Sequence, residues 1–159
     1  MRNPVNFKGK HVKETENALA LWNNGNACSQ SVLGAFAERY GLSEETALKL
    51  SCSFAGGLGG LGLTCGAVTG ALMVLGLEAG RVDPTDQAAR DRNDELVRRF
   101  VERFQGEHGS IICDELTGVP HADPQALQKA KDEGHFDRIC TGLVKRAAEL
   151  VSELIEPGR

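Results

Sequence analysis

Apolar residues recur at every third or fourth position along most of this chain, and no stretch of useful length alternates with a period of two. The first spacing places apolar side chains on one face of an α-helix, whereas alternation would indicate a half-buried β-strand. The 159 residues correspond to about one domain, and 41% apolar residues can form a core without disulfide bonds. We therefore predict an all-α, single-domain helical bundle over residues 1–159, with loosely ordered termini at 1–10 and 156–159.

Capping residues and glycines divide this pattern into about five main helices. Ser43 is a preferred N-cap, and the two glutamates after it suit the first turn of a helix. Thr64 and Asp137 are similar caps, and Asp83-Pro84 opens a long helix. A glycine-rich loop, AGGLGGLGL, precedes the fourth helix. The predicted helices cover residues 12–22, 27–40, 43–52, 65–79 and 83–106 and a last segment from 137, with 110–136 irregular apart from short helices at Asp114 and Pro124.

Charge and composition exclude several classes of function. The 18 basic and 22 acidic residues give a net charge of −4, and the aromatic residues are one Trp, one Tyr and six Phe. A general nucleic-acid binder would need basic patches or aromatic stacking platforms, so we expect no nucleic-acid partner. The N-terminal segment has no apolar signal region, and we expect a cytoplasmic protein. The uncharged stretch 51–77 is too rich in glycine for a membrane span, so we expect a loop followed by a buried helix.

The glycine-rich loop contains a nominal G-x-G-x-x-G pattern at Gly57, Gly59 and Gly62. A dinucleotide-binding fingerprint needs a buried strand directly before it, and here the preceding segment is a capped helix. The glycines instead let the backbone turn tightly and approach another group closely. If that group is a cofactor, the candidate binding residues are Gly59, Gly60, Gly62 and Gly66.

Five cysteines occur, at positions 28, 52, 65, 113 and 140, and no two form a Cys-x-x-Cys pair. We expect Cys28, Cys65 and Cys140 near the starts of three helices and Cys113 just after the end of the long helix. Because successive helices of a bundle run alternately up and down, these four positions should meet at one end of the bundle together with the glycine-rich loop. Cys52 falls on the apolar face of its helix and is predicted to lie in the core.

Helix N-termini favour a thiolate over a thiol and commonly lower a cysteine pKa. We therefore predict an acidic thiol at Cys65. A thiolate is both the nucleophile of disulfide exchange and a ligand for metals, so the pattern alone supports either chemistry.

The order of four cysteines along the chain resembles the pattern of a known family. Cys28, the segment Cys65-Gly66-Ala67-Val68-Thr69-Gly70, Cys113 and Cys140 resemble, in this order, the C_GCAxxG_C_C family of proteins described as redox-active. The similarity runs from about residue 26 to 150. The family's label places a glycine before the second cysteine, where this chain has Thr64, and Cys52 matches none of the four positions. The resemblance implies redox chemistry, and a distant similarity to a cysteine region of iron-containing cytochromes implies iron or an iron–sulfur cluster.

Three hypotheses follow. In the first, the protein is a cytosolic thiol redox protein in which Cys65 attacks and Cys28, Cys113 or Cys140 resolves the mixed disulfide. In the second, Cys28, Cys65, Cys113 and Cys140 bind an iron–sulfur cluster or iron, with zinc less favoured because the paired cysteines of zinc folds are missing. In the third, the chain is a non-catalytic helical interaction module. A redox protein or a small molecule would be the partner in the first case, and the sequence leaves a homo-oligomer open.

Overall fold

The computed structural model describes residues 7–155, and the predicted all-α class is confirmed for this part of the chain. Its α-helices are α1 (Phe7–Asn23), α2 (Cys28–Phe36), α3 (Glu44–Cys52), α4 (Ala55–Leu58), α5 (Gly66–Ala79), α6 (Gln87–His108), α7 (Cys113–Thr117), α8 (Pro124–Asp132) and α9 (His135–Leu154), with a 3-10 turn η1 (Glu38–Tyr40) after α2. The expected number of about five main helices is not confirmed, because α4 forms within the glycine-rich segment. The short helices predicted at Asp114 and Pro124 are present as α7 and α8. Of the termini expected to be loose, residues 1–6 and 156–159 lie outside the described residues.

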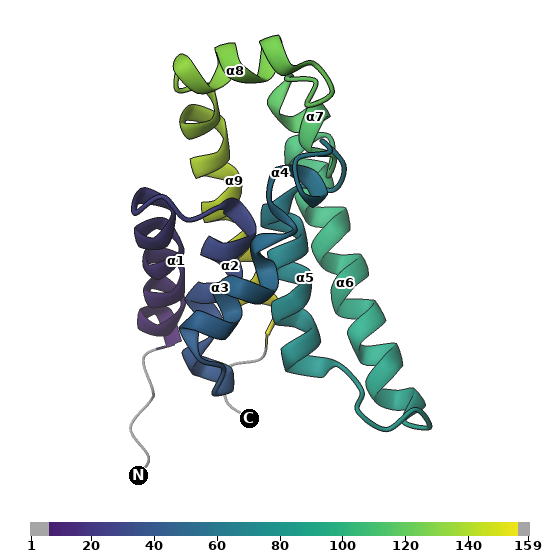
Figure 1. Ribbon diagram of the computed structural model, residues 1–159. Coiled ribbons are helices and arrows are strands. Elements are labelled where there is room, and N and C mark those ends of the chain that lie inside the picture. The colour runs from purple at the N-terminus through teal and green to yellow at the C-terminus, as the bar shows by residue number, and fades with distance from the viewer. Residues whose placement is uncertain (1–6, 156–159) are drawn as a thin grey trace.

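The long helices run alternately up and down, as Figure 1 shows. The starts of α2 and α5 and the end of α6 lie at the upper end of the view, where α4 and α7 are also found. α8 crosses this end and leads into α9. In the packing, α2 contacts α5 most extensively, and α1 lies against α2 and α9. The fold therefore places several helix termini at one end of the bundle.

The core consists of the apolar faces that the sequence pattern predicts. On α2, Val32, Leu33 and Phe36 are fully buried. The stripe on α6 buries Phe100 and Phe104 completely, and the two rings stack with their centroids 5.8 Å apart. On α9 the buried residues include Leu143, Ala147, Leu150 and Leu154. In these three helices, apolar residues spaced three or four positions apart are buried, as the sequence pattern predicts.

Several helix starts differ from the prediction. Ser43 caps α3 as expected, since its Oγ accepts a hydrogen bond from the Thr46 N–H at 3.2 Å. The N-cap of α5 is Cys65 rather than Thr64, because Thr64 forms an isolated antiparallel bridge with Ile112. Asp86 caps α6, which therefore begins later than Asp83-Pro84. α9 begins directly after Gly134, so Asp137 lies in its first turn instead of capping it.

The uncharged segment 51–77 does not form a membrane-spanning helix. Within residues 7–155 no helix combines the length and the apolar character that crossing a bilayer requires. The part of the segment that is helical and apolar, α5, is buried instead against α2 and α6.

The close packing of α5 on α2 depends on glycines. A Cβ at Gly70 would lie 2.8 Å from the carbonyl oxygen of Ser29 and 3.1 Å from Val32 Cβ. A Cβ at Gly66 would collide with the sulfur of Cys28 and lie 3.1 Å from the carbonyl oxygen of Phe54. The absence of side chains at these two positions sets the distance between the helices.

We expect Gly70→Ala to destabilise the fold by about 1–3 kcal/mol, because the new methyl group overlaps a backbone carbonyl that cannot move freely. The matched control is Gly76→Ala in the same helix, where a Cβ meets nothing within 4 Å. There the gain in helix propensity should stabilise the fold by up to about 1 kcal/mol. Urea unfolding followed by circular dichroism measures both changes. Equal effects of the two substitutions would contradict the packing argument.

Candidate functional site

Four cysteines and a histidine line one pocket at the end of the bundle where α4 and α7 lie. The pocket has a volume of about 490 Å³. Its wall includes Cys28, Cys52, Cys113, Cys140 and His121, and apolar side chains such as Trp22 and Phe136. We call this feature the cysteine pocket. It brings together three of the four cysteines expected at one end of the bundle, and the fourth, Cys65, lies behind its wall.

The backbone places Cys65 and Cys113 on one short antiparallel bridge, with Cys65 opposite Ile111 and Cys113 opposite Leu63. Thr64 and Ile112 form an antiparallel bridge, and the flanking hydrogen bonds run from Cys65 N–H to Ile111 O at 2.8 Å and from Cys113 N–H to Leu63 O at 2.6 Å. Side chains on either side of a bridge pair point to the same face, opposite to that of the pair itself. The two cysteines, 4% and 6% exposed, therefore share one buried face of this bridge.

Cys28 reaches the same region from α2, of which it is the first residue. Its sulfur packs directly on the backbone of Gly66, the residue that follows Cys65. The start of α2 is fixed from both sides: the Gln30 side chain accepts a hydrogen bond from Ala27 N–H at 3.0 Å, and Ser29 Oγ donates to the carbonyl of Ser51 at 2.8 Å. Cys28 is half-buried and remains open to the pocket.

The glycines expected to approach a cofactor fall into two groups. Gly59 and Gly60 line the cysteine pocket. Gly62 and Gly66 instead make room for side chains of the protein itself, since a Cβ at Gly62 would collide with the carboxylate of Asp114 and one at Gly66 with the sulfur of Cys28. Gly62 also has a φ of +72°, a conformation that glycine adopts without strain.

Two cysteines lie elsewhere than predicted. Cys140 is in the second turn of α9, because this helix begins at His135, so the helix starts nearest the cysteines are those of α2, α5 and α7. Cys52 is exposed at the end of α3 and faces the pocket rather than the core. The prediction of a core position for Cys52 is wrong, because the buried face of α3 is formed by Ala47 and Ser51.

The prediction of an acidic thiol at Cys65 is also wrong. Burial, and next the charge of Cys28, raise its pKa to about 12. The N–H groups of Ala67 and Val68 at the start of α5 act in the expected direction and lower it, but they are outweighed. Burial and the neighbouring cysteines likewise raise the pKa of Cys140 to about 12 and that of Cys113 well above its ordinary range. The folded site therefore favours neutral thiols at these three cysteines at physiological pH.

The donor atoms do not fit a single metal ion. Within residues 7–155, no group of three or more His, Cys, Asp and Glu side chains is arranged so that it could hold one ion. Zinc or mononuclear iron would need three or four such ligands at bonding distance. We therefore derive no chemistry through a bound ion at this site.

Two residues of the site were missed by the sequence analysis. His121, whose side chain is 6% exposed, places its Nε2 3.9 Å from the sulfur of Cys113. Its Nδ1 lies 2.5 Å from Oδ1 of Asp114, for which the sequence indicates only the position of a short helix. The order of residues in the chain gives no signal for this arrangement, because it depends on the bend at Gly118 and the turn at residues 121–122 that follow α7.

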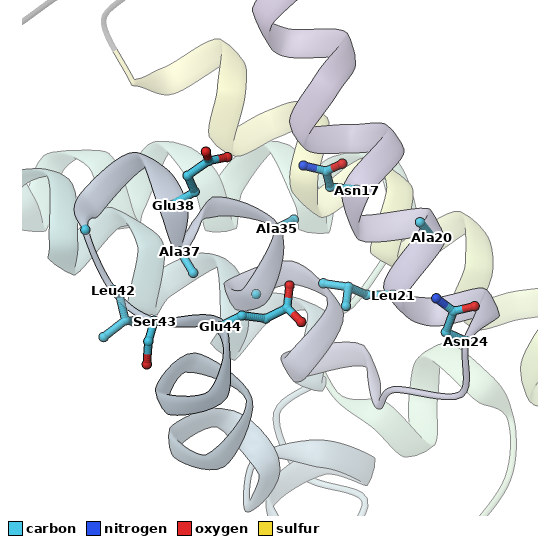
Figure 2. A pocket seen from close by; sticks show the side chains of 12 residues that line it. Asn17, Ala20, Leu21, Asn24, Ala35, Ala37, Glu38, Leu42, Ser43 and Glu44 are labelled. Atoms are coloured by element: carbon cyan, nitrogen blue, oxygen red, sulfur yellow. The ribbon is translucent and has the colours of Figure 1, made fainter.

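A second cavity, of about 600 Å³, lies between α1 and the segment that joins α2 to α3. Figure 2 shows its lining, which includes Asn17, Asn24, Glu38 and Glu44. No cysteine or histidine lines it. The groups able to carry redox or nucleophilic chemistry are thus found in the cysteine pocket.

The burial of the thiols predicts an order of alkylation. With iodoacetamide near neutral pH, the exposed Cys52 should react first, and Cys65 should react at least tenfold more slowly in the folded protein than in urea, because it is both buried and protonated. Peptide mass spectrometry after timed quenching gives the rate at each cysteine. Reaction of Cys65 at the same rate in the folded and unfolded states would contradict this description of the site.

The same pKa shifts predict that the fold loses stability at alkaline pH. An unfolded cysteine releases its proton near pH 8.5–9, whereas Cys65 and Cys140 in the folded chain keep theirs to about pH 12. Between these values the folded state binds more protons, so the free energy of unfolding falls as pH rises, while below about pH 8 the thiols contribute no slope. Urea unfolding at several pH values measures this, and Cys65→Ala should show a smaller fall. An unchanged fall in that variant would contradict the shift at Cys65.

Comparison with known proteins gives one family match. A family model described as "Putative redox-active protein (C_GCAxxG_C_C)" matches residues 26–154, which include Cys28, Cys65, Cys113 and Cys140. No curated protein and no solved structure was found to match the chain. Since the match covers most of the sequence and all four motif cysteines, this chain belongs to the C_GCAxxG_C_C family.

Proposed function

We propose that the protein exchanges two electrons with a disulfide-containing partner in a reducing compartment such as the cytosol, with Cys113 as the attacking thiol and Cys65 as the resolving thiol. The observation that carries this proposal is that Cys65 and Cys113 lie as diagonal neighbours on one buried face of the Thr64–Ile112 bridge. The family's redox character supports the class of reaction.

Charge favours disulfide exchange in this pocket. The pKa values of Cys65, Cys113 and Cys140 are raised by burial and by the neighbouring cysteines, so two adjacent thiolates are strongly disfavoured. A disulfide carries no charge and can be buried without a counter-ion. Oxidation of a pair of neutral thiols to a neutral disulfide therefore leaves the charge of the pocket unchanged.

The order of attack that we propose is the reverse of that expected from the sequence. Cys65 was expected to attack, but it does not line the pocket and is only 4% exposed. Cys113 lines the pocket, so of these two cysteines it is the one that a partner sulfur placed in the pocket can reach.

The exchange proceeds in two balanced steps. The Cys113 thiol loses its proton and its sulfur attacks one sulfur of the partner's disulfide, so that a mixed disulfide forms and the other partner sulfur leaves as a thiolate and takes up a proton. Cys65 then loses its proton and attacks the Cys113 sulfur, releasing the second partner thiol. Two electrons and two protons pass to the partner, which ends as two thiols.

Peptide mapping without reductant tests this assignment. The reduced protein is mixed with glutathione disulfide under nitrogen, quenched in acid and digested. We expect a Cys65–Cys113 disulfide and the release of two thiols per chain. In Cys65→Ser the reaction should stop at glutathione attached to Cys113, since the resolving thiol is missing. The control Cys52→Ser removes the exposed thiol and should still form the internal disulfide.

Each alternative function gives a different result in this experiment. Attachment of glutathione to Cys52 alone would contradict the proposal and favour the hypothesis of a non-catalytic interaction module. A Cys28–Cys65 disulfide would contradict the assigned pair.

Four thiolates are the usual ligands of an iron–sulfur cluster. Stoichiometric iron and inorganic sulfide in protein purified without oxygen would therefore contradict thiol exchange and favour the cluster.

A further inference from the structure

Cys113, His121 and Asp114 form a continuous chain of contacts at the cysteine pocket. The sulfur of Cys113 lies 3.9 Å from His121 Nε2, and His121 Nδ1 lies 2.5 Å from Asp114 Oδ1. Cys113 and His121 both line the pocket. The His121 side chain is almost fully buried, with 6% of its surface exposed. A thiol, an imidazole and a carboxylate in this order are the components of an activated nucleophile.

The local fold holds each member of this chain in place. Cys113 and Asp114 are the first two residues of α7, and their N–H groups donate to the carbonyls of Leu63 at 2.6 Å and Gly62 at 3.1 Å. The backbone N–H of His121 also donates to Asp114 Oδ1, at 3.1 Å, which ties the turn after α7 to the carboxylate. The ring of Phe136 packs on the imidazole with the centroids 5.9 Å apart.

The partners of the imidazole determine which nitrogen carries its proton. Nδ1 faces two acceptors, the Asp114 carboxylate and the carbonyl oxygen of Val119 at 3.2 Å. Neither can donate a hydrogen bond when Asp114 is ionised, so Nδ1 must donate. In the neutral ring Nε2 is then unprotonated, and its lone pair is directed to the sulfur of Cys113.

We infer that His121 is the proton acceptor for the Cys113 thiol during disulfide exchange, and that Asp114 is a positioning residue that holds the ring in the required tautomer. This inference rests on the proposed function. As the Cys113 sulfur bonds to the partner's disulfide, its proton moves to His121 Nε2, and the imidazolium then gives this proton to the departing partner thiolate. The ring ends neutral, and the proton count of the exchange is unchanged.

A base is needed here because the thiol does not ionise readily by itself. Burial and the neighbouring cysteines raise the pKa of Cys113, so the free thiolate is a very small fraction at neutral pH. Other titratable groups line the same pocket from four more elements, namely Cys28 of α2, Cys52 of α3, Lys131 of α8 and Cys140 of α9. Among these groups and Asp114, the carboxylate is the one that hydrogen-bonds to the ring, and it stabilises the imidazolium.

The rate of Cys113 glutathionylation as a function of pH tests the inference. The reaction is measured in the full chain carrying Cys52→Ser and Cys65→Ser, in which the mixed disulfide accumulates, by quenched mass spectrometry. With His121 present, the rate should rise by clearly less than tenfold per pH unit, because the imidazole accepts the thiol proton in place of hydroxide. With His121→Gln added, the rate at pH 7 should fall about 100-fold and then rise about tenfold per pH unit. Added imidazole should restore part of the rate in His121→Ala.

Two further variants separate this role from a structural one. Asp114→Asn keeps an oxygen near Nδ1 but loses the charge that holds the ring in its tautomer, so the rate at pH 7 should fall and its pH profile should become steeper. His135→Gln is the matched control, because His135 bonds only to the carbonyl of Thr117, at 2.8 Å, and should leave the rate and its pH profile unchanged. Circular dichroism and urea unfolding report whether each variant is folded.

The outcomes distinguish the two proposals. If Cys113 forms no mixed disulfide even with His121 present, the proposed function fails. If the mixed disulfide forms, but a folded His121→Gln protein keeps both the rate and the shallow pH dependence, the exchange stands and the role of His121 is overturned. If His121→Gln does not fold, the imidazole rescue of His121→Ala and the steeper profile of Asp114→Asn decide the question, and the inference fails if both are absent.

Discussion

Several cysteine thiols lie close together in a region that is largely shielded from water. The cost of charging them there is the constraint on which the rest of this structure depends. Desolvation raises the pKa of Cys65, Cys113 and Cys140, and the charges of neighbouring cysteines raise it further. A second thiolate next to a first is therefore costly. Neutral thiols and neutral disulfides are the states that such a pocket accommodates without a counter-charge, so electrons leave it most easily together with protons.

The bundle satisfies this constraint through close backbone approach. Gly66 and Gly70 allow α5 to lie against α2, which brings the sulfur of Cys28 onto the first turn of α5. A Cβ at Gly57 would lie 2.8 Å from Cys113 Cβ, so the glycine-rich segment packs on the site in the same way. At Gly66 and Gly57, the space that a side chain would fill is thus taken by Cys28 and Cys113. The same glycines determine how closely the core packs and how close the cysteines lie.

The sequence predicts the fold class and the end of the bundle where Cys28, Cys113 and Cys140 lie, because both depend on periodicity and chain direction. Alternating helices were enough to place Cys28 and Cys113 at one end of the bundle, although α9 begins earlier than Asp137. The pKa of Cys65 was predicted with the wrong sign because a motif indicates a helix start but not the depth of burial. His121 was missed because its contact with Cys113 is set by a turn, which has no periodic signal.

A protein can activate a buried thiol in two ways, and this site contains the elements of both. Helix dipoles can lower the pKa of the sulfur, as the N–H groups of Ala67 and Val68 do at Cys65, but here burial and neighbouring sulfurs outweigh them. A base within reach can instead take the proton only when the sulfur reacts, so that no thiolate accumulates beside the other cysteines. Where neighbouring thiolates would repel one another, transfer of the proton to a base costs less free energy than a lowered thiol pKa. The imidazole beside Cys113, held by a carboxylate, is therefore the arrangement that the electrostatics of this pocket favour.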